Sequence, residues 1–177
     1  MKNKKAQIWV ETAIYSLIGL AIIGIILAIA NPSISRYKDE IIIEQTIAAL
    51  NDLNGKVLEV RETAGNIRIV EFRVKKGSLI IDCQEDKILY LLEESGLEYS
   101  EPGAEIQQGD IKIKTEKNNK KYDISLVLEY KDENIDLTYN EGNEKKTFSQ
   151  ASVAYKFSIE NLGNEGEKTK IDIMEIS

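Results

Sequence analysis

Glu11 is the residue whose chemical type and place in the chain most invite a functional reading. It lies immediately before an uncharged run, residues 12–30, and three lysines, Lys2, Lys4 and Lys5, precede it. A carboxylate at the mouth of a membrane helix is costly unless it has a partner. Either Glu11 lies at the membrane interface, where it favours the helix N-terminus through the helix dipole, or it pairs with a cation inside a membrane-embedded assembly.

The uncharged run predicts a membrane-spanning helix. At a rise of about 1.5 Å per residue, residues 12–30 make a helix of roughly 28 Å, close to the hydrocarbon thickness of a bilayer. The run exceeds the about 7–15 apolar residues of a secretory signal peptide, and residues 31–36 offer no small-residue cleavage site. We therefore expect the helix to be retained. Because lysines precede it, the positive-inside rule places the start of the chain in the cytoplasm and the rest outside the cell.

Small residues recur along this helix at spacings that suit helix packing. Two readings stand: small residues three or four apart let helices approach closely in an apolar medium, or they reflect ordinary membrane-helix composition, in which Gly is common. The residues that we assign to packing are Ala13, Ser16, Gly19, Gly24 and Ala28.

The segment Lys5-Ala6-Gln7-Ile8-Trp9-Val10-Glu11, followed by the apolar run, resembles the class III signal peptide of archaeal type IV pilins and archaellins. The likeness covers about residues 4–60. It differs from the commonest pattern at Ala6, where Gly is frequent, and at Trp9, where a small polar residue is frequent. Trp9 also suits an interfacial aromatic anchor.

In that family a dedicated membrane peptidase cuts before the apolar run. The resemblance implies a cut between Ala6 and Gln7, directed by Lys5, Ala6 and Gln7, which removes residues 1–6 and makes Glu11 the fifth residue of the mature chain. It implies that Glu11 neutralises the new N-terminal amine, usually that of a neighbouring subunit. Such a charge-assisted contact also meets the electrostatic need of a carboxylate at this depth.

The resemblance also implies a set of partners. These are a prepilin peptidase, a cytoplasmic assembly ATPase, a membrane platform protein and further copies of the chain itself in a helical homopolymer. Membrane lipid covers the helix before assembly, and the assembled filament lies at the cell surface, where it can serve adhesion.

Residues 32–62 predict an amphipathic stalk helix that follows the filament-core helix of residues 7–31. Pro32 either bends the helix or lies in the first turn of a new one. We expect helix to about Arg61, and we expect its apolar stripe to dock on the domain that follows. The stripe consists of Ile43, Ile47, Leu50, Leu53, Val57 and Val60.

Beyond Arg61 the apolar period changes from about 3.6 to 2, which predicts an extracellular β head over residues 63–177. The expected fold class is α+β: a long helix, apolar in its first half and amphipathic in its second, followed by an antiparallel sheet or sandwich of about seven or eight short strands.

Local expectations for the head concern its turns and irregularities. They are a bulge at 69–70, a hairpin turn at 75–77, a loop over 93–108, a hairpin turn at 132–134 and a turn at 161–166.

Composition argues against most chemistry. The net charge of -7 argues against nucleic acid as a partner. The chain has no histidine, and its one cysteine, Cys83, is expected to be a buried hydrophobe rather than an intermolecular disulfide. Residues 132–136 match the start of a calcium loop, but Leu137 and Asn143 stand where Gly and a bidentate Glu are needed. We therefore expect no metal, no cofactor and no enzymatic activity.

The sequence thus predicts a pilin-like structural subunit. The alternative is an uncleaved, single-pass membrane anchor that displays an extracellular binding domain. A membrane-tethered enzyme is the third hypothesis, and the motif search finds no phosphate loop, nucleophile elbow or triad to support it.

Overall fold

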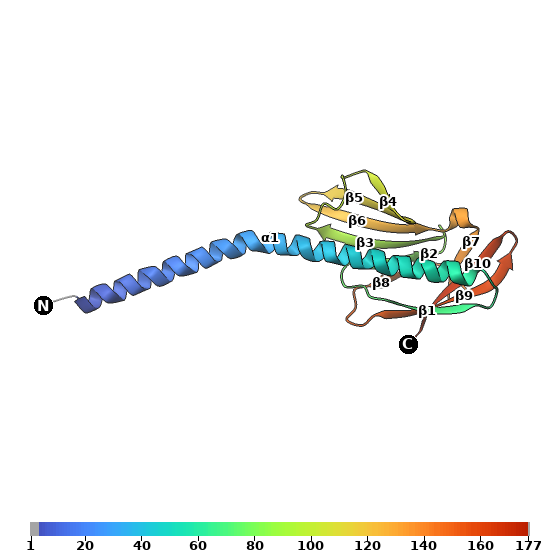
Figure 1. Cartoon of the computed structure of the whole chain (residues 1–177), viewed down its shortest axis with the longest axis horizontal. Helices are drawn as coiled ribbons and strands as arrows, with labels where there is room; N and C mark the ends of the chain where they lie inside the picture. Colours follow the sequence, from blue (N-terminus) through green and yellow to red (C-terminus); the bar gives the residue numbers. More distant parts are fainter. Residues whose placement is uncertain (1–3, 177) are drawn as a thin grey trace. The chain divides into compact units, whose positions relative to one another are not determined.

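The computed structural model of the chain describes the backbone from Lys4 to Ile176. It describes the side chains from Trp9 to Ile176, except that of Pro32. It has the expected α+β layout, with one long N-terminal helix followed by a mostly antiparallel β domain (Figure 1). The chain divides into two units, one up to Lys38 and one from Asp39 onward, and each is described by itself. The second unit, Asp39–Ser177, is called the head below.

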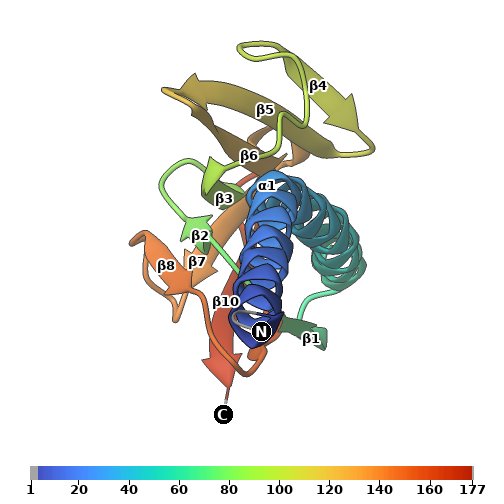
Figure 2. The ribbon, with the colours of Figure 1, turned by 90° about the vertical axis from the view of Figure 1, so that its left-hand side faces the viewer.

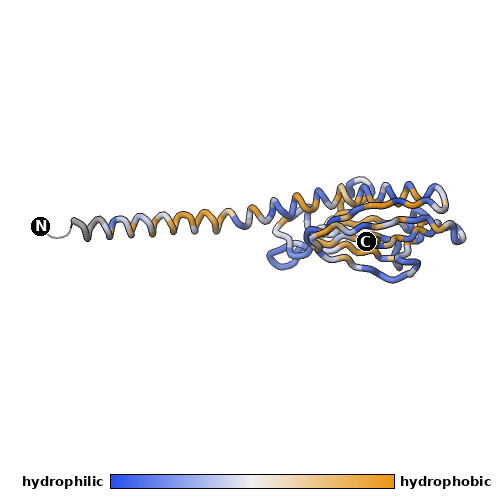
Figure 3. The backbone as a smooth tube through the Cα atoms, turned by 90° about the horizontal axis from the view of Figure 1, so that it is seen from below, coloured by the Kyte–Doolittle hydropathy of each residue, from blue (hydrophilic) through white to orange (hydrophobic). Residues whose placement is uncertain are grey.

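Helix α1 spans Lys4–Arg61, so the predicted C-terminal end of the helix at Arg61 is confirmed. It is helical through Pro32, and the predicted alternative of a new helix starting there is therefore wrong. In the first unit the tube passes from blue through white to one continuous orange, apolar stretch, after which polar and apolar residues begin to alternate (Figure 3). This change of pattern falls where the helix enters the head.

The head is built from ten strands within the described part of the chain, more than the seven or eight expected. One short 3₁₀ helix, η1 (Lys131–Glu133), precedes β7. The strands are β1 (Ile67–Phe72), β2 (Ser78–Asp82), β3 (Lys87–Ser95), β4 (Glu105–Gln108), β5 (Ile111–Asn118), β6 (Lys121–Glu129), β7 (Ile135–Tyr139), β8 (Lys146–Ser149), β9 (Tyr155–Glu165) and β10 (Lys168–Ile176).

These strands form two sheets. The smaller has the order β1-β9-β10-β7 and the larger the order β4-β5-β6-β3-β2-β8. All neighbours pair antiparallel except β10 and β7, which run parallel. A parallel pair needs a long connection between its strands, and here the chain passes through β8 and β9 before β10 returns to β7.

The second half of α1 supplies the centre of the core. All six residues of the predicted apolar stripe are buried and share one cluster with the inner faces of both sheets. The teal segment of α1 lies beside the strands in both views (Figures 1 and 2). The predicted docking of the stripe on the domain that follows is therefore confirmed. A helix face with apolar residues every three or four positions is buried against the rest of the fold.

The predicted hairpin at 75–77 is wrong, because β1 and β2 belong to different sheets and the segment between them crosses from one to the other. The predicted bulge at 69–70 is also wrong. Strand β1 pairs with β9 in regular register from Ile67 to Phe72, with Ile67 and Ile69 facing outward and Val70 facing the core.

Three further turn predictions need correction. The predicted loop 93–108 contains the end of β3 and the whole of β4. Of the predicted hairpin turn at 132–134, the first two residues belong to η1 and Asn134 caps its C-terminal end, and the segment leads from β6 into the other sheet. The predicted turn at 161–166 is mostly strand, because β9 continues to Glu165 and the register shift in this pair falls at Lys170/Ile171.

Candidate functional site: the first half of the helix and the head surface

The predicted processing residues Lys5, Ala6 and Gln7 lie in the first turns of α1, where the backbone is helical. Their side chains lie outside the described residues, as do residues 1–3 of the predicted leader. The geometry of the predicted cleavage point is therefore not described.

Glu11 lies on α1 with an exposed side chain, at the end of the helix where the uncharged run begins. In helical geometry residues four apart are neighbours on one face. A backbone amine at position 7 would consequently lie on the same side of the helix as the Glu11 carboxylate.

The apolar run exposes large side chains on every side of the helix. The side chains of Leu17, Leu20 and Ile29 are 70%, 69% and 69% exposed. The helix is long and apolar enough to cross a membrane and lies near the N-terminus. A helix that is apolar all round is stable only when lipid or protein covers it.

The five predicted packing residues do not form one stripe. At about 100° per residue, Ala13, Gly24 and Ala28 fall within an arc of about 60°, whereas Ser16 and Gly19 lie progressively further round the helix. Both glycines have open space where a Cβ would stand. The helix therefore offers small residues on more than one side.

Ser16 adds a polar group to this apolar surface without leaving it unsatisfied. Its Oγ donates a hydrogen bond to the Thr12 carbonyl oxygen, 2.9 Å away. This local bond lets a hydroxyl lie in an apolar medium. Trp9, Thr12, Ala13 and Ser16 line a notch of about 280 Å³ along this part of the helix.

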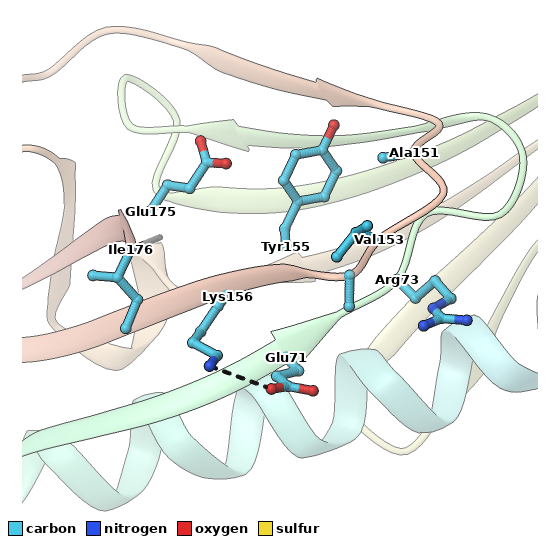
Figure 4. A pocket seen from close by; sticks show the side chains of 9 residues that line it. Glu71, Arg73, Ala151, Val153, Tyr155, Lys156, Glu175 and Ile176 are labelled. Carbon is cyan, nitrogen blue, oxygen red and sulfur yellow. Dashed lines mark ion pairs between the residues drawn. The ribbon is translucent and has the colours of Figure 1, made fainter.

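The head has an open groove of about 500 Å³ near the end of the smaller sheet (Figure 4). Lys156 and Glu71 approach to 3.7 Å in it, and Arg73 and Glu175 add one charge of each sign. The Tyr155 hydroxyl is engaged with the Ser149 carbonyl oxygen at 2.8 Å. The groove therefore presents charges of both signs at an open surface.

No cluster of three or more His, Cys, Asp or Glu residues able to hold a metal is found in the described part of the chain. The predicted burial of Cys83 is confirmed, and its side chain is 2% exposed. Burial, together with nearby carboxylates, raises the pKa of its thiol to about 11. A buried thiol with a raised pKa is a poor nucleophile.

Sequence reasoning missed Asp39, the most highly connected carboxylate at the beginning of the head. Its carboxylate accepts hydrogen bonds from Lys76 Nζ at 2.6 Å, Ser95 Oγ at 2.8 Å and the Gly96 backbone at 3.2 Å. The one available signal was position: Asp39 precedes Ile43 by four residues and so lies on the buried face.

No protein family model, curated protein or solved structure matches this chain.

Proposed function

We propose that this chain is a type IV pilin-like structural subunit of a surface filament. Its N-terminal helix is stored in the membrane, with the start of the chain in the cytoplasm, and is then buried among copies of itself at the filament centre. The head forms the outer surface and serves adhesion. The observation that carries the proposal is an exposed apolar stretch of α1 that follows the carboxylate of Glu11 and precedes a compact head.

The first step of the argument concerns what covers the helix. Lipid chains and aliphatic side chains are equally apolar, so the hydrophobic effect does not favour one cover over the other. Close backbone approach and polar contacts decide instead. Ala13, Gly24 and Ala28 supply the close approach on one side of the helix, and Gly19 supplies it on another.

The second step concerns Glu11. An ionised carboxylate in an apolar assembly is tolerated when a cation pairs with it. Cleavage between Ala6 and Gln7 would create such a cation at the right depth, because the new amine lies one helical turn before Glu11. The pair would favour subunits whose amine and carboxylate meet, which sets the axial register of the filament.

The N-terminus of the protein from its native cells tests processing. Mass spectrometry of the intact chain and its N-terminal peptide should show a start at Gln7. A start at Met1 or Lys2 would instead support the alternative, an uncleaved membrane anchor that displays a binding domain.

Filament formation tests the role of Glu11. Glu11→Ala should leave the head folded and the chain in the membrane but abolish or strongly reduce filaments seen by electron microscopy. The matched control is Glu40→Ala, which removes an exposed carboxylate of the head part of α1 and should leave filaments unchanged. Normal filaments from the Glu11 variant would refute the assigned role.

A further inference from the structure

The stretch of α1 that follows the apolar run carries two charges, and both are positive. Between Thr12 and Lys38 the sequence has no other charges than those of Arg36 and Lys38, whose side chains are exposed. Neither belongs to an ion pair found among the described residues. Of the 23 basic and 30 acidic residues of the chain, five and one fall in residues 1–38, which leaves the head with 18 and 29. The two cations therefore precede a strongly acidic head.

The two cations lie at the depth that a layer of lipid phosphates would occupy. At about 1.5 Å per residue, Arg36 and Lys38 follow Ala30, the end of the apolar run, by about 9 Å and about 12 Å along the helix. The headgroup region adds about 5–8 Å to each side of the hydrocarbon core. In a helix the Cα–Cβ bonds tilt toward the N-terminus, so both long side chains lean back toward the apolar run. Arg and Lys near the end of a membrane helix reach the interface in this way.

Aromatic residues mark both ends of the same span. Trp9, which precedes the apolar run, is 81% exposed, and Tyr37, which lies between the two cations, is 67% exposed. The 28 residues from one to the other correspond to about 42 Å of helix, and a bilayer with its headgroups is about 40–45 Å thick. Trp and Tyr are enriched at the two interfaces of a membrane. The spacing therefore places Tyr37 in the outer headgroup region when Trp9 lies in the inner one.

The placement of the two cations around the helix favours lipid over a protein partner. At about 100° per residue, Arg36 and Lys38 are about 160° apart around the axis of α1. A protein that docks on one side of the helix would meet one of them, whereas lipid headgroups surround a membrane helix and meet both.

The nearest acids affect the two cations differently. Arg36 is followed three and four residues later by Asp39 and Glu40, at spacings that allow contact on a helix. Asp39 is held by Lys76, but Glu40 is exposed and competes for Arg36. Lys38 has no acid three or four residues before or after it. We therefore expect Lys38 to contribute more to lipid binding than Arg36.

We infer that Arg36, Tyr37 and Lys38 form an interfacial collar that binds the headgroups of anionic phospholipids at the outer surface of the membrane. The inference rests on the proposed function only for the membrane storage of the helix. The collar fixes the depth of the stored helix and must leave the headgroups before the helix enters a filament. Three lysines before the apolar run against two cations after it preserve the predicted orientation.

Lipid retention by the full chain tests the collar. In native mass spectrometry from micelles doped equally with phosphatidylglycerol and phosphatidylcholine, the wild type should retain phosphatidylglycerol preferentially. Lys38→Gln should lower this preference roughly threefold to fivefold, which is the effect of one cation near an anionic surface, and Lys38→Arg should preserve it.

The matched control is Lys121→Gln, which removes an exposed cation of the head and should have little effect. Lysines that precede the apolar run are present in every variant, so they do not alter the comparison. Equal losses of preference from Lys38→Gln and Lys121→Gln, or no loss from either, would overturn the inference.

Fluorescence quenching in phosphatidylglycerol vesicles tests the depth. Ser33→Cys introduces a thiol at an exposed position one turn before Tyr37, and Cys83 is buried, so a maleimide fluorophore labels residue 33 alone when the head is folded. A spin label on the lipid headgroup should quench it more than one deep in the acyl chain. Adding Arg36→Glu and Lys38→Glu should lower the headgroup quenching at least about twofold, because the lipid then repels the segment. Unchanged quenching would exclude the collar as the group that sets the depth.

These results are separable from the test of the proposed function. A native N-terminus at Met1 would refute the pilin proposal and leave the collar standing, because an uncleaved anchor also spans the membrane. If Lys38→Gln abolishes filaments but keeps the preference for phosphatidylglycerol, the segment contacts a neighbouring copy and the inference fails while the pilin proposal stands. Release of the wild type from membranes by alkaline carbonate would refute both.

Discussion

Lys76 Nζ lies 2.6 Å from Asp39 Oδ1, and this ion pair joins the first residue of the head part of α1 to the connection between β1 and β2. The other carboxylate oxygen accepts bonds from Ser95 and Gly96 at the end of β3. Asp39 therefore ties the helix to the connection between the two sheets and to the end of β3 in the larger sheet. Burial by itself raises the pKa of Asp39, but the hydrogen bonds from Lys76, Ser95 and Gly96 outweigh burial and hold the pKa below its ordinary value.

Replacing Asp39 should destabilise the head strongly. In Asp39→Asn the side chain keeps its shape but loses the negative charge that pairs with Lys76 and accepts the hydrogen bond of Ser95. We therefore expect the free energy of unfolding to fall by about 2–3 kcal/mol. Urea titration of the full chain in detergent, followed by near-ultraviolet circular dichroism of the head tyrosines, measures it. Glu40→Gln, an exposed neighbour, should change stability by less than about 0.5 kcal/mol. Equal effects of the two changes would contradict the buried clamp.

The lowered pKa of Asp39 gives a signed pH dependence. The group binds its proton more readily in the unfolded chain, where the ordinary value is 3.8, than in the folded head. Its contribution is therefore fully present above that value and is lost as pH falls through the lower pKa of the folded state. Stability of the wild type should decline more steeply than that of Asp39→Asn between about pH 5 and pH 2. If the free energies of unfolding of the wild type and Asp39→Asn fall in parallel with pH, other carboxylates dominate acid unfolding.

Gly77 is required by both its backbone and its surroundings. Its φ is +76°, and a Cβ there would collide with the Leu91 carbonyl oxygen of the neighbouring strand. Gly65 has a similar φ of +79° but open space at the same place. Gly65→Ala should cost about 1 kcal/mol for the left-handed backbone alone, and Gly77→Ala should cost at least about 3 kcal/mol, because backbone atoms must also move. Similar unfolding midpoints for the two variants would contradict this account.

The sequence predicted the helix and its buried stripe well because both follow from local periodicity. The six stripe residues from Ile43 to Val60 are all buried, and apolar spacing of three or four is a property of one segment alone. The change of apolar period beyond Arg61 predicted the β part of the head for the same reason. Strand β4 was missed because all four of its residues are exposed, so no apolar alternation marks it.

Strand pairing could not be predicted in the same way. Lys75-Lys76-Gly77 has the composition of a hairpin turn, yet the chain uses it to change sheets. A glycine with positive φ serves a hairpin and a crossover equally well. Asp39 escaped prediction for a related reason: its hydrogen-bond partners lie 37 and more residues away in sequence. Its place four residues before Ile43 indicates burial, but it does not indicate which groups the carboxylate contacts.

Cys83 offers an independent readout of head opening. Its side chain is 2% exposed, and burial raises the pKa of its thiol to about 11, so a maleimide should label it only when the head unfolds. Labelling of Cys83 in the native wild type should be far slower than labelling of the new thiol that Ser158→Cys introduces at a partly exposed position of β9. If opening and closing are fast, Asp39→Asn should raise the Cys83 rate by roughly 30- to 150-fold, because the rate follows the open population. Labelling of Cys83 in the native wild type as fast as in urea would show that the head core is not closed around it.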